Sequence, residues 1–166
     1  MMNDLRGLWR GKSAANGEWI EGNYFKTQVN QNIIHCIIPF SKFINVFPEN
    51  GIYQVVPETL CRYTGISDKS GVKVFEGDIV TGIAYSMEWR GVIVWISEIA
   101  GFGVRYWRRE DPTAWENSSI LKQMTRGRKD EFAAEVIGNI YDNPGLLFAT
   151  GADEGNAAKD CLLSAT

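Results

Sequence analysis

The segment from Gly65 to Val80, GISDKSGVKVFEGDIV, places two glycine-containing turns around a run of apolar residues. In the first turn, Asp68 is expected to accept hydrogen bonds from nearby backbone amides and Gly71 to take a positive φ angle. In the step Glu76-Gly77-Asp78, Gly77 is expected to allow a sharp bend and Asp78 to bind the amides of that bend. The segment therefore predicts short strands joined by tight turns.

The acidic step also allows a functional interpretation. Glu76 and Asp78 are two residues apart and share one face of an extended strand, as an acid–base pair or a metal site requires. No further His, Asp or Glu cluster completes such a site, because the nearest carboxylates, Asp68 and Glu88, look like turn or surface residues. We therefore favour a structural role for the step and assign no catalytic and no metal-binding residue.

Toward the N-terminus, Arg6–Asn23 is predicted to form two strands joined by a turn at Asn16-Gly17, a dipeptide that favours tight hairpins. Trp9 and Trp19 flank this turn and are expected to pair across the strands. The apolar segment Asn32–Phe40 is predicted to be a buried strand.

Toward the C-terminus, GVIVWIS and GFGVRYW predict two strands around a turn at Glu98–Gly101. Ala133–Leu147 is predicted to be a last strand closed by a turn that contains Asn143 and Pro144, whereas Ser119–Met124 is compatible with either a strand or a short helix. The predicted fold is mainly β, with an N-terminal antiparallel unit over residues 1–57, an SH3-like small β-barrel over 58–149 and a flexible tail over 150–166.

Composition excludes several classes of protein. The 166 residues are 45% hydrophobic, and 17 Lys and Arg against 20 Asp and Glu give a net charge of -3, so no global field attracts nucleic acid or an anionic membrane. No apolar run approaches the roughly 20 residues of a spanning helix, and the N-terminus lacks the apolar core of a signal peptide. We expect a soluble, cytoplasmic protein without membrane contact.

The cysteine and histidine content predicts neither a disulfide framework nor an enzyme. Cys36, Cys61 and Cys161 are widely spaced, which suits a reducing compartment. A zinc site of His35, Cys36 and Cys61 is disfavoured because adjacent strand residues point to opposite faces. No nucleophile motif or phosphate-binding loop is present, so no enzymatic activity and no cofactor are predicted.

Three segments resemble one protein family. They are RGKSAANGEWIEGNYF, VVPETLCRYTGISDKSGVKVFEGDIV and AEVIGNIYDNPGLL, and in this order they resemble the YopX family over roughly positions 6–147. That family is found mainly in bacteriophages and prophages. The resemblance implies a mostly β protein and no known activity, and it carries over no catalytic or ligand-binding residues. The extension over 150–166 lies outside the family pattern.

Basic and aromatic residues occur together near the end of the predicted barrel. Arginines beside flat rings are typical of single-stranded nucleic-acid binding, because phosphates pair with arginine and bases stack on aromatic rings. The candidate residues are Arg105, Trp107, Arg108 and Arg109, with Arg126, Arg128 and Lys129 as a second cluster. Acidic residues follow each cluster directly, so local ion pairs can cancel the field.

Six tryptophans in a small β protein favour a protein–protein role, because tryptophan is enriched at interface hot spots. Trp89 and Trp115 lie in polar neighbourhoods and, with Trp107, are candidates for exposed anchors; packing over the end of a barrel is the alternative. The favoured function is a non-enzymatic phage or prophage accessory protein that associates with itself as a homo-oligomer and binds a phage or host protein. The alternative is a nucleic-acid-binding accessory protein.

Overall fold

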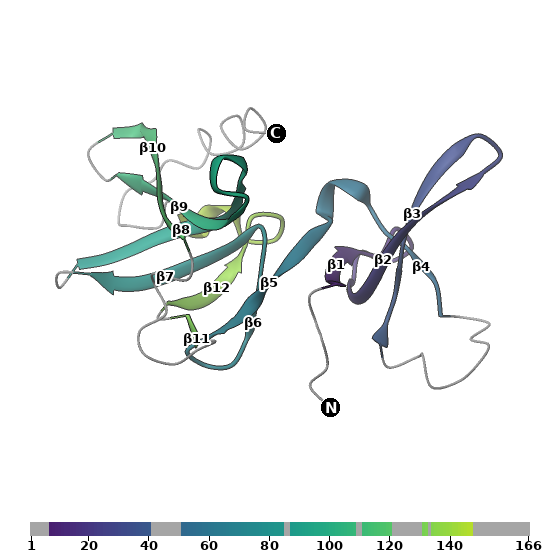
Figure 1. Ribbon diagram of the computed structural model, residues 1–166, viewed down its shortest axis with the longest axis horizontal. Helices are drawn as coiled ribbons and strands as arrows, with labels where there is room; N and C mark the ends of the chain where they lie inside the picture. The colour runs from purple at the N-terminus through teal and green to yellow at the C-terminus, as the bar shows by residue number, and fades with distance from the viewer. Residues whose placement is uncertain are drawn as a thin grey trace. The chain divides into compact units, whose positions relative to one another are not determined.

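The computed structural model describes residues 7–40, 51–84, 87–108, 111–120, 131–132 and 134–147. Side chains are described within these ranges except at 83–84, 87–88, 106–108, 111–120 and 131–132. The chain divides into two compact units, residues 1–65 and 66–166, whereas the sequence predicts a division at residue 57. Figure 1 shows the strands that build them. The predicted tail over 150–166 lies outside the described residues.

Strands dominate both units, and the part of the chain that the structure describes contains short 3-10 helices but no α-helix. The prediction of a mainly β protein is confirmed. Within the same ranges, no helix has the length and apolar character needed to cross a membrane.

The first unit is an antiparallel sheet in the order β5–β1–β2–β3–β4. Its strands are β1 (Leu8–Lys12), β2 (Trp19–Val29), β3 (Asn32–Ile38), β4 (Tyr53–Gln54) and the start of β5 (Cys61–Asp68). The 3-10 helix η3 (Pro57–Thr59) precedes β5. The buried hydrophobic residues of this unit are Leu8, Cys36, Ile37, Val55, Cys61 and Tyr63.

The β1–β2 turn forms where the sequence predicts it, with Gly17 at a φ of 74°. The expected pair of Trp9 and Trp19 is wrong, because the register places Trp9 opposite Gly22 and Trp19 opposite Lys12. The Trp9 ring instead lies 5.1 Å from the ring of Tyr24. On the Trp19 ring, the guanidinium of Arg10 lies 4.8 Å from the centroid, a distance suited to a cation–π contact.

A second hairpin joins β2 to β3 through Asn30 and Gln31, which both have positive φ angles, of 47° and 69°. Two central residues with positive φ make a two-residue turn of the type that matches strand twist. The predicted strand over 32–40 is therefore β3, but only its second half is buried, because Ile33 near the turn is 66% exposed.

The second unit is an antiparallel sheet in the order β10–β9–β8–β7–β12. Its strands are β7 (Asp78–Ala84), β8 (Met87–Ile96), β9 (Gly101–Arg108), β10 (Asp111–Ile120) and β12 (Glu135–Asn139). Two short strands, β6 (Lys73–Phe75) and the parallel β11 (Glu131–Phe132), pair with β5. The described pairings run from β10 to β12 without closing, so an SH3-like barrel is not confirmed.

Both faces of this second sheet are packed. On one face, Val74, Val80, Ile93, Val104 and Ala134 form a buried cluster. On the other face, Ile79, Val92 and Leu147 form a second cluster, to which the 3-10 helix η5 (Pro144–Leu147) contributes. Adjacent residues such as Ile79 and Val80 enter different clusters because successive strand residues point to opposite faces. The predicted turn after β8 is present as the 3-10 helix η4 (Ser97–Ile99).

Gly22 allows two stretches of backbone to cross closely, and this yields a prediction. A Cβ atom at Gly22 would lie 2.0 Å from the carbonyl oxygen of Ile38, which belongs to the backbone and cannot rotate away. We expect Gly22→Ala to lower the free energy of unfolding by about 1–3 kcal/mol, measured by urea denaturation.

Gly7→Ala is the matched control, because a Cβ atom there would lie no closer than 3.7 Å to its nearest neighbour, Asn23 Oδ1. This control is expected to stay within about 0.5 kcal/mol of the wild type. Equal stabilities of the two variants would contradict the close crossing at Gly22.

Candidate functional site

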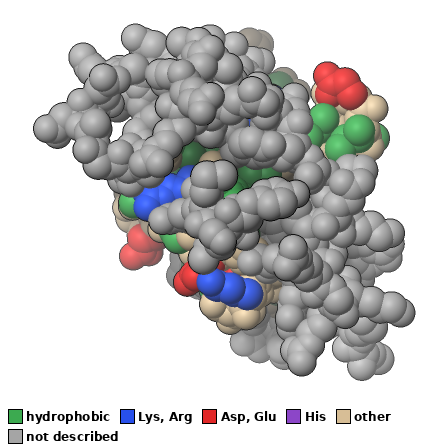
Figure 2. Space-filling model, turned by 90° about the vertical axis from the view of Figure 1, so that its left-hand side faces the viewer, with side chains coloured by type: hydrophobic (Ala, Val, Ile, Leu, Met, Phe, Trp, Pro, Cys, Tyr) green, Lys and Arg blue, Asp and Glu red, His purple; other side chains and the backbone are tan. Residues whose placement is uncertain are grey.

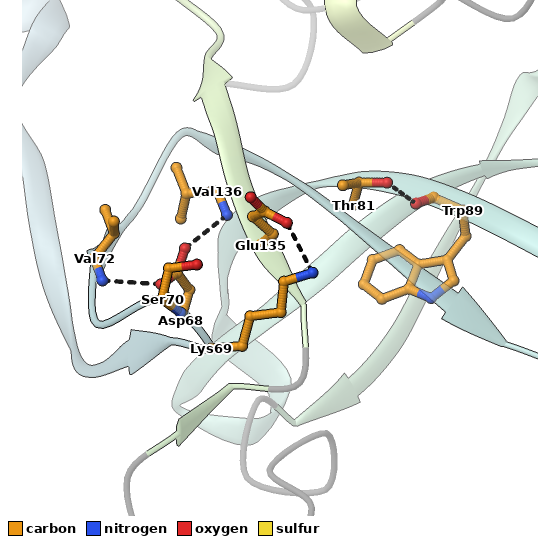
Figure 3. A network of polar contacts seen from close by, with 8 residues as sticks. All are labelled: Asp68, Lys69, Ser70, Val72, Thr81, Trp89, Glu135 and Val136. Carbon is orange, nitrogen blue, oxygen red and sulfur yellow. Dashed lines mark hydrogen bonds and ion pairs between the residues drawn. The ribbon is translucent and has the colours of Figure 1, made fainter.

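Asp68 is almost fully buried, and its carboxylate binds backbone amides of its own turn and of a segment distant in sequence. Oδ1 accepts hydrogen bonds from the amides of Ser70 and Val72, each at 2.8 Å. Oδ2 accepts one from the amide of Val136 in β12, at 3.0 Å, as Figure 3 shows. Gly71 completes the turn with a φ of 83°. The carboxylate therefore organises its own turn and attaches that turn to β12.

An ion pair at the surface accompanies this buried group. Lys69 Nζ lies 2.7 Å from Glu135 Oε2, on side chains that remain 56% and 43% exposed (Figure 3). The amide of Lys69 also donates to the carbonyl of Ala134. Because exposed ion pairs contribute little to stability, the buried carboxylate is the stronger link between these two segments.

The second acidic position, Asp78, is fully buried as well, and its Oδ2 accepts a hydrogen bond from the amide of Phe75 at 2.7 Å. Between Phe75 and Asp78, Gly77 has a φ of 78°. The amide of Gly77 donates to Ile93, and its carbonyl accepts from Ile140. The acidic step thus shapes the bend between β6 and β7 and joins it to two other segments.

The last turn uses amide side chains in the same way. Asn139 Oδ1 accepts hydrogen bonds from the amides of Tyr141 and Asp142. The backbone N–H of Asn143 donates to the backbone carbonyl of Asn139, and Pro144 begins η5. From β8, Arg90 Nη1 donates to the carbonyl of Leu146 at 2.9 Å, which attaches η5 to the sheet.

Titratable groups suited to nucleophilic or metal chemistry do not converge in the described ranges, where no three His, Cys, Asp or Glu side chains form a group able to hold a metal ion. His35 Nδ1 lies 2.7 Å from the hydroxyl of Tyr24. Burial raises the pKa of the Cys36 thiol, which keeps it neutral and disfavours both metal binding and nucleophilic attack. Cys61 Sγ donates to the carbonyl of Thr59 at 3.2 Å.

The predicted nucleic-acid surface is described only in part. Arg105 lies in β9 opposite Val92 and Asn117. Trp107 is opposite Trp115, and Arg108 is opposite Asp111, with side chains outside the description. Arg109, Arg126, Arg128 and Lys129 lie outside the described residues. Figure 2 shows one face of the molecule, on which described basic and acidic side chains are interspersed.

Of the predicted interface tryptophans, Trp89 has a described side chain, and its ring packs against the buried cluster around Val80 and Ile93. A Cβ atom at Gly82 would lie 2.6 Å from Trp89 Cζ2, so the ring rests directly on that glycine. Trp89 is therefore partly buried against the core of the second unit.

A tryptophan outside the predicted interface candidates is exposed. Trp95 is 41% exposed near the end of β8, and its ring meets that of Phe102 edge-to-face at 5.1 Å. Ile99, in the connecting 3-10 helix, is 45% exposed. We name Trp95, Ile99 and Phe102 the Trp95 tip. The exposure of Trp95 is hard to predict from the sequence because the residue lies in an apolar strand. Its proximity to the Glu98–Gly101 turn is a signal that the strand is leaving the core.

One family of known proteins matches this chain. The YopX protein family matches residues 8–148, most of the chain. The chain belongs to the YopX family. The resemblance inferred from the sequence is thus confirmed, and the match includes the Asp68, Asp78 and Asn143 turns of this YopX protein.

One solved structure similar to this YopX chain is that of protein EF1440 from Enterococcus faecalis. It is 20% identical, and the alignment covers 84% of this chain and 96% of that chain with a TM-score of 0.41. No significant match was found among curated proteins.

The bonds of Asp68 in the YopX chain predict a large effect of a small change. Asp68→Asn keeps the shape of the side chain but replaces one acceptor oxygen with an N–H donor, so at least one of the three amides loses its partner. We expect the free energy of unfolding to fall by about 1–3 kcal/mol, measured by chemical denaturation.

Glu135→Gln is the control for a general effect of removing a carboxylate from this region. It removes the exposed ion pair with Lys69 and is expected to cost less than about 1 kcal/mol. A larger loss for Glu135→Gln than for Asp68→Asn would contradict the role assigned to Asp68.

Proposed function

We propose that this YopX protein is a phage- or prophage-derived, non-enzymatic module that acts by binding protein, with the Trp95 tip as its contact surface. The observation that carries the proposal is a large aromatic side chain, Trp95, left 41% exposed beside a second aromatic ring. Burying such a side chain in a partner releases apolar area from water, and tryptophan is prominent among interface hot spots. The site of action in this proposal is the cytoplasm of a bacterial host.

The geometry of the Trp95 tip favours binding to the surface of a folded protein. The edge-to-face contact with Phe102 holds the Trp95 ring in a defined orientation, which reduces the side-chain entropy lost on binding. Ile99 adds exposed apolar area in the same β8–β9 connection. A partner with a shallow apolar pocket suits this arrangement.

The absence of catalysis is part of the proposal and has its own support. The buried carboxylates Asp68 and Asp78 accept hydrogen bonds from backbone amides, which engages the oxygens that acid–base chemistry would need. Each is placed to fix a turn.

The proposal predicts that Trp95→Ser reduces protein binding. The tagged wild-type chain and the variant would be compared as baits in extract from a phage-infected or lysogenic host. Recovery of the proteins that associate with the wild type is expected to fall about tenfold or more in the variant, because truncation of a hot-spot tryptophan costs about 2 kcal/mol.

Val72→Ser provides the matched control, since Val72 is 49% exposed and belongs to the Asp68 turn rather than to the β8–β9 connection. Its recovered proteins should equal those of the wild type. Circular dichroism would verify that both variants stay folded. Equal recovery with folded Trp95→Ser and wild type would contradict the proposed contact surface.

Nucleic-acid binding through Arg105, Trp107, Arg108 and Arg109 is the alternative function. It predicts gel-shift complexes with single-stranded DNA or RNA that weaken steeply as salt rises, because phosphate contacts release counterions. For the protein-binding function we expect no such complexes at about 0.15 M salt. Salt-dependent binding that Arg105→Ser weakens would support the alternative and contradict our preference.

A further inference from the structure

The hairpin of β2 and β3 leaves one long strand edge without a described neighbour. β1 pairs with β2 from Trp19 to Asn23, whereas β3 pairs with β2 from Asn23 to Val29. Within the described ranges, no strand pairs with the other edge of β2 from Tyr24 onward. Figure 1 shows β2 and β3 continuing together to their turn.

This part of the hairpin is exposed on both of its faces. Every residue from Lys26 to Ile33 is exposed, including the apolar side chains of Val29 at 46% and Ile33 at 66%. An isolated two-stranded ribbon is marginally stable in water. Proteins usually protect such an edge with prolines, bulges or several charges, but β2 beyond Asn23 contains one charged residue, Lys26, and no proline.

The register identifies which residues offer hydrogen bonds at this edge. In a two-residue hairpin, the residues that flank the turn, Val29 and Asn32, form a hydrogen-bonded pair, and such pairs alternate along the strands. Tyr24, Lys26 and Gln28 therefore direct their N–H and C=O groups to the open edge. The same alternation directs the carbonyl of His35 to the other side of β3, where it accepts from the amide of Val55.

We propose that this edge pairs antiparallel with the same edge of a second copy, with Thr27 opposite Thr27 on a two-fold axis. In that register Lys26 of each copy faces the neutral Gln28 of the other. Phe25 of each copy faces Val29 of the other, an aromatic and β-branched pair of the kind that stabilises sheets. Phe25, Thr27 and Val29 share one strand face, as their pairing with alternate β3 residues requires.

Charge selects this register over its neighbour. Shifting the axis by one residue toward the N-terminus would place Lys26 opposite Lys26, and like charges directly opposite are destabilising. The register centred on Thr27 has no charged pair, and in it the exposed Val29 of each copy lies opposite Phe25 of the other. The second copy is thus a partner whose edge complements this one in hydrogen bonds, side-chain size and charge.

Self-association of this kind extends the proposed binding function but uses other residues, so the two can fail separately. Light scattering over about 1–100 μM protein is expected to show the wild-type mass rising from one chain to two. Thr27→Asp and Thr27→Lys each place like charges on the axis. Each should raise the dissociation constant by about tenfold or more.

An equimolar mixture of Thr27→Asp and Thr27→Lys tests the two-fold register directly. Opposite charges then face each other, so the mixture is expected to regain the dimer that each variant lacks. Gln31→Asp, in the turn beyond the paired edge, is the matched control and should associate like the wild type.

The proposal is overturned by a wild-type chain that stays monomeric over the whole range, by charged variants that associate like the wild type, or by a mixture that does not regain the dimer. A dimer lost in Trp95→Ser but kept in Thr27→Asp would also overturn it, because the Trp95 tip would then carry self-association. Unchanged capture of other proteins by Thr27→Asp would leave the proposed function intact.

Discussion

The second unit depends on one buried carboxylate. Asp68 accepts hydrogen bonds from Ser70, Val72 and Val136, and the last of these lies 68 residues along the chain. Burying a charge is costly unless hydrogen bonds compensate it, and three backbone amides do so here. Because the same group holds the turn after β5 and an amide of β12, it connects the beginning of the unit to its final strand. β12 also pairs with β7, and its Val136 and Ile137 pack against the two buried clusters.

This use of polar groups limits what remains for function. Asp78, Asn139 and Asn143 serve other turns in the same manner, so the turn side chains that sequence inspection would offer to a ligand are engaged with the backbone. The exposed groups with potential for recognition instead lie at hairpins, at Trp95 in one unit and at Val29 in the other. In our proposals the two units use different contacts: an aromatic tip for a partner and a strand edge for a second copy.

The turns were the most predictable part of the molecule. Gly71, Gly77 and Asp68 have chemical properties that a tight bend requires, so a single sequence is sufficient to locate them. The hairpin at Asn30 and Gln31 was missed because neither residue is glycine, although both adopt positive φ angles. The solvent exposure of individual side chains was harder to predict. Whether Trp89 or Trp95 faces solvent depends on where the core of the sheet ends. That is determined by strand register and by segments distant in sequence, such as Ala134 and Val136, which belong to the same packed cluster as Trp89.

Amide hydrogen exchange at Val136 is a direct test of whether the Asp68 carboxylate holds β12 in place. The amide donates to Asp68 rather than to a strand, and in the absence of that bond it would be an edge amide open to water. We predict that the Val136 amide exchanges as slowly as the core amides of β7, since its exchange requires the whole attachment to break. Exchange of Val136 at the rate of an unprotected loop, while β7 stays protected, would show that Asp68 does not hold β12.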